Sequence, residues 1–189
     1  LSAIMGPVII PILRRLKMGQ TERVDGVQSH LLKAGTPTMG GVIILLAIVI
    51  TSVFYIGNYP KIIPILFLTV GFGIIGFLDD YLKVVMKRSD GLYPKQKMGL
   101  QIVVTAIFAF YMVKFSGVPL TMLIPFSGGK YLDLGWFAYP LYLLVIVGFV
   151  NSTNITDGID GLAASITAVV GGFFALAAFV FGINDLVVL

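Results

Sequence analysis

The sequence has 189 residues, of which 58% are hydrophobic and 12% charged, with a mean hydropathy of +1.00 and a formal net charge of +4. Soluble domains carry about a quarter charged residues, so this composition indicates a membrane protein. With no cysteine and one histidine, His30, the sequence excludes a disulfide framework, a cysteine-based metal site and a multi-histidine site within these residues.

Six apolar segments organise the chain, at 1–13, 42–57, 62–78, 99–115, 134–150 and 161–183. A bilayer crossing takes about 20 residues. We therefore predict an all-α, polytopic transmembrane helical bundle with five full spans and one partial span. Without a visible repeat or linker, 1–189 is interpreted as a single transmembrane domain. Because both ends lie in or beside apolar runs, we expect the chain to be cut from a longer protein at both ends.

Positive charge is distributed unevenly between the loops. Of the 13 Lys and Arg residues, only Lys61, Lys114 and Lys130 fall outside the loops after the first and third segments. The positive-inside rule predicts that these two basic loops face the cytoplasm. Alternation of the spans then places 151–160 on the same side.

The first basic loop ends in Gly35-Thr-Pro-Thr-Met-Gly-Gly41. Glycines and a proline before a helix predict a tight backbone with exposed N–H groups, which suits an anion such as phosphate. A turn with an N-cap by Thr38 explains the same pattern and is more common. His30, in the same loop, is interpreted as a solvated or hydrogen-bonded side chain rather than a ligand.

Two adjacent carboxylates, Asp79 and Asp80, end the third segment, with Lys83 one helical turn further on. Adjacent carboxylates repel each other unless a cation or proton lies between them, and Mg²⁺ is usually held by one or two carboxylates plus substrate phosphates. A charged helix end with a plain salt bridge is the alternative. Lys97, in the basic loop that follows, would attract an anionic substrate or lipid, or would only set topology.

On the opposite side, alternating residues around Ser127-Gly-Gly129 predict a short periplasmic hairpin. Trp136, Tyr139 and Tyr142 after it fit an interfacial aromatic belt.

The most polar motif between spans is Asn151-x-x-Asn154-x-x-Asp157-Gly-x-Asp160-Gly. Carboxylates beside a membrane span are costly and usually functional, and a step of three keeps successive polar groups on one helix face. Capping is the alternative, with Asn151 ending one helix and Asp157 or Asp160 starting the next. It leaves the other polar residues unexplained.

Together and in this order, the three motifs resemble those of the polyprenyl-phosphate sugar-1-phosphate transferases, over nearly the whole chain. The resemblance implies a ten-helix enzyme of the bacterial inner membrane, with its active site on the cytoplasmic face and Mg²⁺ as cofactor. The Pro-Thr-Met-Gly-Gly form is most similar to members that transfer phospho-MurNAc-pentapeptide from its UDP carrier to undecaprenyl phosphate, giving lipid I and UMP. Membrane lipids and a second copy of the chain are implied partners; no nucleic acid is expected.

The resemblance also implies roles for individual residues. Asp79, Asp80 and Lys83 match the catalytic motif, and one aspartate would activate the lipid phosphate. The residues assigned to substrate binding are Lys33, Thr38, Lys97, Asn151, Asn154, Asp157, Gly158 and Asp160, the last at the position that recognises uracil. The main Mg²⁺ ligand and a histidine cluster are expected beyond Leu189.

Three other interpretations remain open. A related transferase would use UDP-GlcNAc instead. A transporter or channel would use the carboxylates as ion sites, but it predicts charges near mid-span rather than at helix ends. A non-catalytic scaffold leaves the four aspartates of the motifs without a role.

Overall fold

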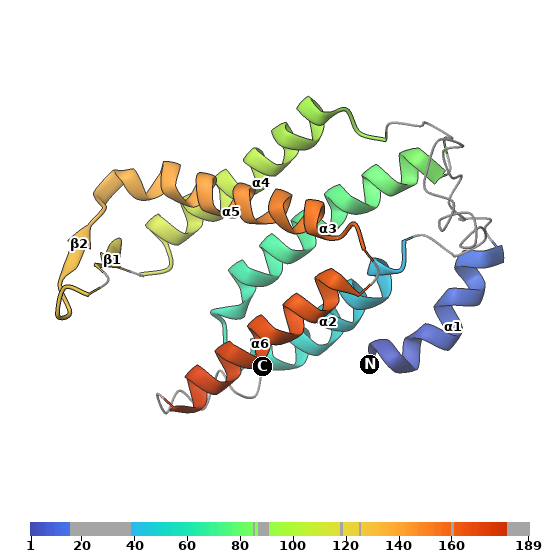
Figure 1. Cartoon of the computed structure of the whole chain (residues 1–189), viewed down its shortest axis with the longest axis horizontal. Coiled ribbons are helices and arrows are strands. Elements are labelled where there is room, and N and C mark those ends of the chain that lie inside the picture. The colour runs from blue at the N-terminus through green and yellow to red at the C-terminus, as the bar shows by residue number, and fades with distance from the viewer. Residues whose placement is uncertain are drawn as a thin grey trace. The chain divides into compact units, whose positions relative to one another are not determined.

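The fold is helical, as expected for an all-α membrane protein (Figure 1). The computed structural model describes residues 1–15, 39–84, 86, 91–117, 119–124, 126–159 and 161–180. In these ranges the helices are α1 (Ser2–Arg15), α2 (Gly41–Ile56), α3 (Ile62–Val84), α4 (Pro94–Lys114), α5 (Ala138–Thr156) and α6 (Leu162–Val180). The chain divides into two compact units, Leu1–Leu143 and Leu144–Leu189, and each is described by itself.

Four helices are long and apolar enough to cross a membrane. They are α3 with 23 residues, α4 with 21, Gly135–Thr156 with 22 and α6 with 19. The remaining predicted full span, α2, has 16 residues. At 1.5 Å per residue it is about 24 Å long, less than the hydrocarbon core of about 30 Å. The predicted fold class is confirmed, and four of the five predicted full spans reach spanning length.

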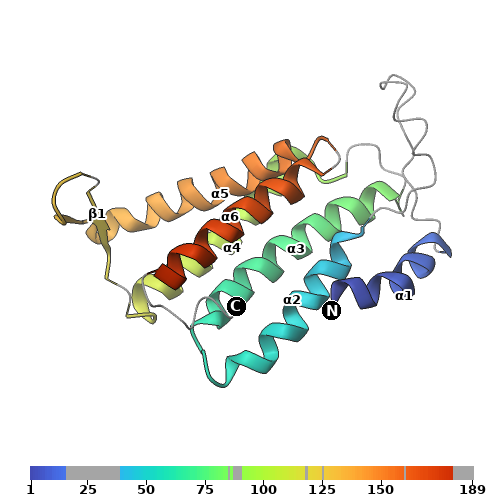
Figure 2. The same cartoon turned by 60° about the horizontal axis from the view of Figure 1, so that its bottom comes forward.

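In the first unit, neighbouring helices pack in chain order. α1 contacts α2, α2 contacts α3, and α3 contacts α4. Figures 1 and 2 show α3 between α2 and α4. A side chain at Gly73 would come within 2.6 Å of Leu45 in α2, and one at Gly71 within 2.7 Å of Val104 in α4. Residues two positions apart on a helix are rotated by about 200° from each other. The two glycines therefore allow α2 and α4 to pack closely against opposite faces of α3.

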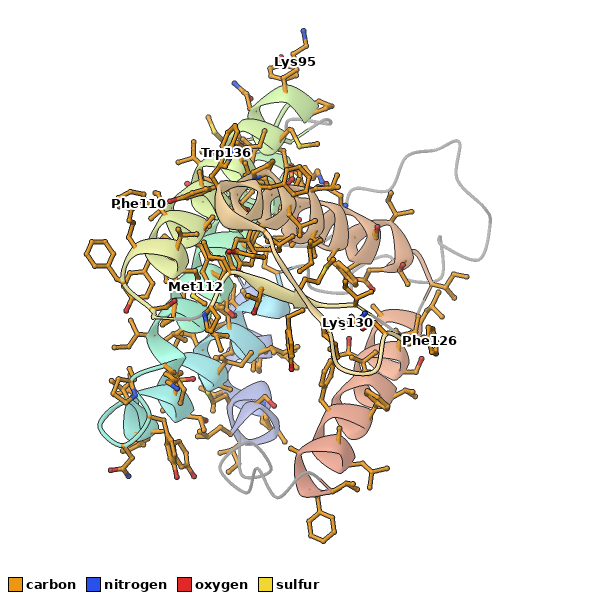
Figure 3. All side chains as sticks on the ribbon, turned by 90° about the vertical axis from the view of Figure 1, so that its left-hand side faces the viewer. Lys95, Phe110, Met112, Phe126, Lys130 and Trp136 are labelled. Atoms are coloured by element: carbon orange, nitrogen blue, oxygen red, sulfur yellow. The ribbon has the colours of Figure 1, made fainter. Side chains whose placement is uncertain are left out.

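Much of the apolar surface of the first unit faces outward. Phe54 in α2 is 78% exposed and Phe110 in α4 is 53% exposed. Figure 3 shows Phe110 projecting away from its helix. In water such exposure would favour aggregation, whereas for a membrane protein it is surface for lipid or for further helices.

The predicted hairpin is present after α4. Strand β1 (Thr121–Leu123) pairs antiparallel with β2 (Tyr131–Asp133), with Met122 opposite Leu132. In the turn, the Ser127 hydroxyl donates a hydrogen bond of 2.6 Å to the Ile124 carbonyl, and the Lys130 N–H donates one of 3.1 Å to the Ser127 Oγ. A short 3₁₀ helix (Gly135–Phe137) follows, carrying the exposed Trp136. The aromatic belt remains a prediction.

The antiparallel arrangement gathers several helix ends at one end of the first unit. The start of α2, the end of α3 and the start of α4 lie toward the same end (Figure 2). This is where the sequence motif Asp79-Asp80-x-x-Lys83 lies.

Candidate active site at the end of α3

Asp79 belongs to the buried face of α3. It follows Ile75 by one turn, and both residues are buried, at 7% and 4% exposed. A carboxylate in such surroundings is costly unless it is hydrogen-bonded and paired with a positive charge. The geometry around Asp79 supplies both.

Three groups contact the Asp79 carboxylate. The Lys83 ammonium lies 2.7 Å from Oδ2, at the i+4 position of the same helix. The Lys97 ammonium, from α4, lies 3.9 Å from the same oxygen. The backbone N–H of Leu92 donates a 2.9 Å hydrogen bond to Oδ1. Both carboxylate oxygens are therefore engaged, and the salt bridge considered in the sequence analysis is what the structure shows for Asp79 and Lys83.

The turn before α4 brings these partners together. Gly91 has φ +60°, and Pro94 stands at the first position of α4. The Tyr93 N–H donates a 3.3 Å hydrogen bond to the Gln96 side chain, and the Lys97 N–H donates one of 3.0 Å to the Tyr93 carbonyl. A proline at the first helical position and a glutamine closing back on the N-cap are typical helix-start chemistry. The result is that Lys97 sits one turn into α4, facing the end of α3.

The two lysines place two positive charges beside the carboxylates at the end of α3. Two ammonium groups share one carboxylate, and the side chains of Lys83 and Lys97 remain 43% and 24% exposed. Lysine ammonium groups are point-charge ligands for phosphate. The cluster can therefore hold an anion beside the end of α3.

Asp80 has different surroundings from Asp79. It is half-buried, and within the residues that the structure describes it makes neither a hydrogen bond nor an ion pair. Successive helix positions differ by about 100°, so Asp80 does not share the direction of Asp79 toward α4. Asp80 is the carboxylate available for a ligand.

The first-loop motif is described only from Met39 onward; Lys33, Thr38 and His30 lie outside the described residues. Met39 is buried with φ +67°, an uncommon conformation for a residue with a side chain. The helix N-cap is Gly40, without a side-chain capping bond. A side chain added at Gly40 or Gly41 would meet no heavy atom within 4 Å. The sequence did not predict the conformation of Met39.

The second unit holds the Asn151 motif on the last turns of α5. The Asn151 amide donates a 2.8 Å hydrogen bond to the Val147 carbonyl, and Asn154 and Asp157 are exposed. The Asp157 N–H continues the helical pattern with a 3.0 Å bond to the Thr153 carbonyl. Gly158 follows in the turn, and Asp160 lies outside the described residues.

The capping alternative is wrong for Asn151. Helix α5 continues to Thr156, so Asn151 lies inside the helix rather than at its end. Asn151 and Asn154 are three positions apart on a continuous helix and share a face, as predicted.

No group of three or more His, Asp or Glu side chains that could hold a metal ion occurs among the described residues. The predicted Mg²⁺ site involves Asp79, Asp80 and a ligand beyond Leu189, and it stays a prediction. An apolar hollow lies elsewhere on the first unit, lined by Ile63, Pro64, Phe67, Ile107, Phe108 and Tyr111. Its lining offers no charged group.

These features define a class of protein: a polytopic helical membrane protein with its charged residues clustered at helix ends rather than at mid-span. The transporter interpretation, which requires charges near mid-span, is disfavoured by the position of Asp79 and Asp80 in the last two turns of α3. A family model described as glycosyl transferase family 4 matches residues 62–189. The chain belongs to this family, since the match covers more than half of it.

Known proteins similar to the chain agree with the motif-based resemblance. A phospho-N-acetylmuramoyl-pentapeptide-transferase signature matches residues 33–45. Proteins with that name from Acetivibrio thermocellus and Bacillus pumilus are 48% and 45% identical to the chain, each over 94% of it and over 53% and 56% of their own length. The one from Bacillus subtilis is 43% identical over 94% of the chain and 56% of its own length. The chain thus spans about half the length of these relatives. Its long apolar helices and these bacterial relatives together show that it is a bacterial membrane protein.

Proposed function

We propose that this chain forms part of an enzyme that transfers phospho-MurNAc-pentapeptide from UDP-MurNAc-pentapeptide to undecaprenyl phosphate, giving lipid I and UMP. The observation that carries the proposal is the 41–48% identity to proteins named phospho-N-acetylmuramoyl-pentapeptide-transferase across nearly the whole chain. The charged cluster at the end of α3 supplies the chemistry that such a transfer needs.

The reaction joins two anions. An oxygen of the lipid phosphate forms a bond to the sugar-linked phosphorus of the UDP donor, and the bond from that phosphorus to the bridging oxygen breaks. UMP leaves with the bonding electron pair. Positive groups that offset the combined charge are the main requirement for catalysis, and the exposed parts of Lys83 and Lys97 provide them.

Asp80 is the carboxylate that we assign to direct contact with the reactants. It is half-buried and unpaired within the described residues, whereas both oxygens of Asp79 are engaged. Asp80 would accept the proton of the lipid phosphate or help to hold the Mg²⁺ of the site. The proposal includes Mg²⁺, which Asp80 would help to hold and which would neutralise negative charge on the substrate phosphates.

The residues at the end of α5 are proposed to bind the nucleotide-sugar. Asn154 and Asp157 are exposed, so their amide and carboxylate groups are available for hydroxyl and amide groups of the donor. The remaining members of this set are proposed on the motif alone: Lys33, Thr38, Asn151, Gly158 and Asp160.

The location is proposed as the bacterial inner membrane, with the site on the cytoplasmic face. The ten basic residues on that side and the helix ends that carry the site support this orientation. A water-soluble nucleotide and a membrane-bound acceptor would meet there. A homodimer surrounded by membrane lipids is part of the same proposal.

Donor and acceptor specificity tests the proposal. The complete protein, purified in nanodiscs with Mg²⁺, is assayed for UMP release with UDP-MurNAc-pentapeptide or UDP-GlcNAc, each with and without undecaprenyl phosphate. We expect release only with the muropeptide donor and the lipid acceptor together. If UMP is released with UDP-GlcNAc but not with UDP-MurNAc-pentapeptide, the protein is instead the related transferase that uses UDP-GlcNAc. If UMP is released with neither donor, the enzyme proposal is overturned.

A further inference from the structure

The turn at residues 91–93, just before α4, lies directly against the Asp79 side chain. Leu92, in this turn, is separated from Asp79 by 13 positions, and its N–H bonds to the Asp79 Oδ1 at 2.9 Å. The same carboxylate bonds Lys83 within α3 and attracts Lys97 in α4. One buried side chain therefore joins two helices and the turn that precedes α4.

Gly91 makes this closure possible. A Cβ at this position would lie 2.5 Å from the Asp79 Oδ1, 2.7 Å from the Lys83 Cε and 3.0 Å from the Asp79 carbonyl oxygen. The last of these is a backbone atom and cannot move aside alone. The φ of +60° is also one that residues with side chains rarely adopt. A side chain at Gly91 therefore requires Asp79, Lys83 or the turn itself to shift.

We propose that Asp79 is a positioning residue: with Lys83, Gly91 and the Leu92 N–H it forms a latch that holds the start of α4, and with it Lys97, against the end of α3. This inference rests on the proposed transfer reaction, because it concerns how Lys97 is positioned to bind a phosphate of the substrates. It separates the two neighbouring aspartates by role. Asp79 acts through Lys97, and Asp80 acts on the reactants.

The contacts of Asp79 favour positioning over chemistry. If its carboxylate turned away from these contacts, the Leu92 N–H and the partly exposed Lys83 ammonium would each lose a partner. Such a change would open the turn during each reaction cycle. A carboxylate that stays ionised and bonded keeps the turn closed instead.

Amide hydrogen exchange tests the latch itself. The complete protein in nanodiscs is compared as wild type, Gly91→Ala and Gly117→Ala. Gly117 is the matched control, because its φ is +66° yet an added Cβ meets no heavy atom within 4 Å. Both variants place an alanine at a positive φ, and only Gly91→Ala meets Asp79. We expect the peptide containing the Leu92 amide to exchange at least about tenfold faster in Gly91→Ala alone. Equal exchange in the three proteins would overturn the latch.

Steady-state kinetics of UMP release test the positioning role. A lysine displaced from the donor phosphates weakens binding, so Gly91→Ala and Asp79→Asn should each raise KM for the UDP donor at least about fivefold, while kcat falls less. Gly117→Ala should match wild type within about twofold. A loss of kcat of about 10²-fold in Asp79→Asn, with Gly91→Ala near wild type in both kcat and KM, would overturn the proposal, because a positioning role predicts similar effects of the two variants.

The two experiments separate the latch from the enzyme activity on which it depends. If wild type releases no UMP while Gly91→Ala still loses protection at Leu92, the proposed function fails and the latch stands as a structural contact without a role in transfer. If wild type is active and Gly91→Ala behaves as Gly117→Ala in both measurements, the latch fails and the transferase proposal stands.

Discussion

Asp79 and Asp80 are chemically identical neighbours in the chain, and the fold gives them different surroundings. Asp79 faces α4 and bonds Lys83 and the Leu92 N–H, whereas Asp80 is half-buried and unpaired in the described part of the chain. The pair and its proximity to Lys83 were predictable from the sequence. Which aspartate is engaged was not, because that depends on which face of α3 packs against α4 and on a bond across 13 positions.

Lys83 and Lys97 contact the same carboxylate at different distances, and this predicts different effects of removing them. Lys83→Met breaks the 2.7 Å ion pair of a buried carboxylate. Because Lys83 is partly exposed, we expect a loss of about 1–2 kcal/mol in stability rather than the larger cost of a fully buried pair. Lys97→Met removes only a 3.9 Å contact. It should lower stability less and raise KM for the UDP donor more. Thermal unfolding in detergent and donor kinetics measure the two effects; equal Tm losses would contradict this difference.

At the scale of elements, the site residues lie on helical turns that continue beyond the apolar segments. The apolar runs themselves end near 78 and 150, and the fourth begins near 99. The structure extends α3 to Val84 and α5 to Thr156, and it begins α4 at Pro94. Hydropathy marks where a helix leaves the hydrocarbon, not where its hydrogen bonds stop. The polar turns outside the apolar runs are the ones that carry the chemistry.

The hairpin and the helical fold class were predictable, because turn chemistry and apolar length are local properties of the sequence. The 16-residue α2 is shorter than a full span, since the turn at residues 57–61 ends it early. The left-handed conformation of Met39 has no local signal, because a non-glycine residue adopts it only when its surroundings impose it.

The packing of α3 predicts which of its glycines tolerate a side chain. Gly71→Val and Gly73→Val would press on Val104 and Leu45, which lie on opposite neighbours of α3. We expect each to lower stability by about 1–3 kcal/mol, as overpacking does. Gly76→Val is the control in the same helix, because no heavy atom lies within 4 Å of its Cβ position. Tm values from thermal unfolding in detergent compare the three variants; a control that loses as much as the other two would show that helix propensity, not packing, sets the effect.

At the scale of the whole molecule, the charge distribution predicts an orientation. Lys95 extends away from the start of α4 (Figure 3), on the side proposed to be cytoplasmic, and Ser127 lies in the hairpin turn on the opposite side. The chain has no cysteine of its own. A cysteine introduced at Lys95 should react with a membrane-impermeant thiol reagent only in inverted vesicles, and one at Ser127 only in intact cells. The reverse pattern would invert the topology and remove the cytoplasmic site.

The central claim is that Asp80 is the carboxylate that contacts the reactants of a phospho-sugar transfer. The most direct measurement is UMP release from UDP-MurNAc-pentapeptide with undecaprenyl phosphate and Mg²⁺ by the complete protein, comparing wild type, Asp80→Asn and Asp133→Asn. Asp133 is a control of the same chemistry, because within the described residues its carboxylate accepts a 3.0 Å bond from the Gly135 N–H, in the hairpin region. We expect Asp80→Asn to stay folded and lose at least about 10²-fold in kcat, the size typical of a key catalytic group, with Asp133→Asn near wild type. Normal UMP release by Asp80→Asn would contradict the claim.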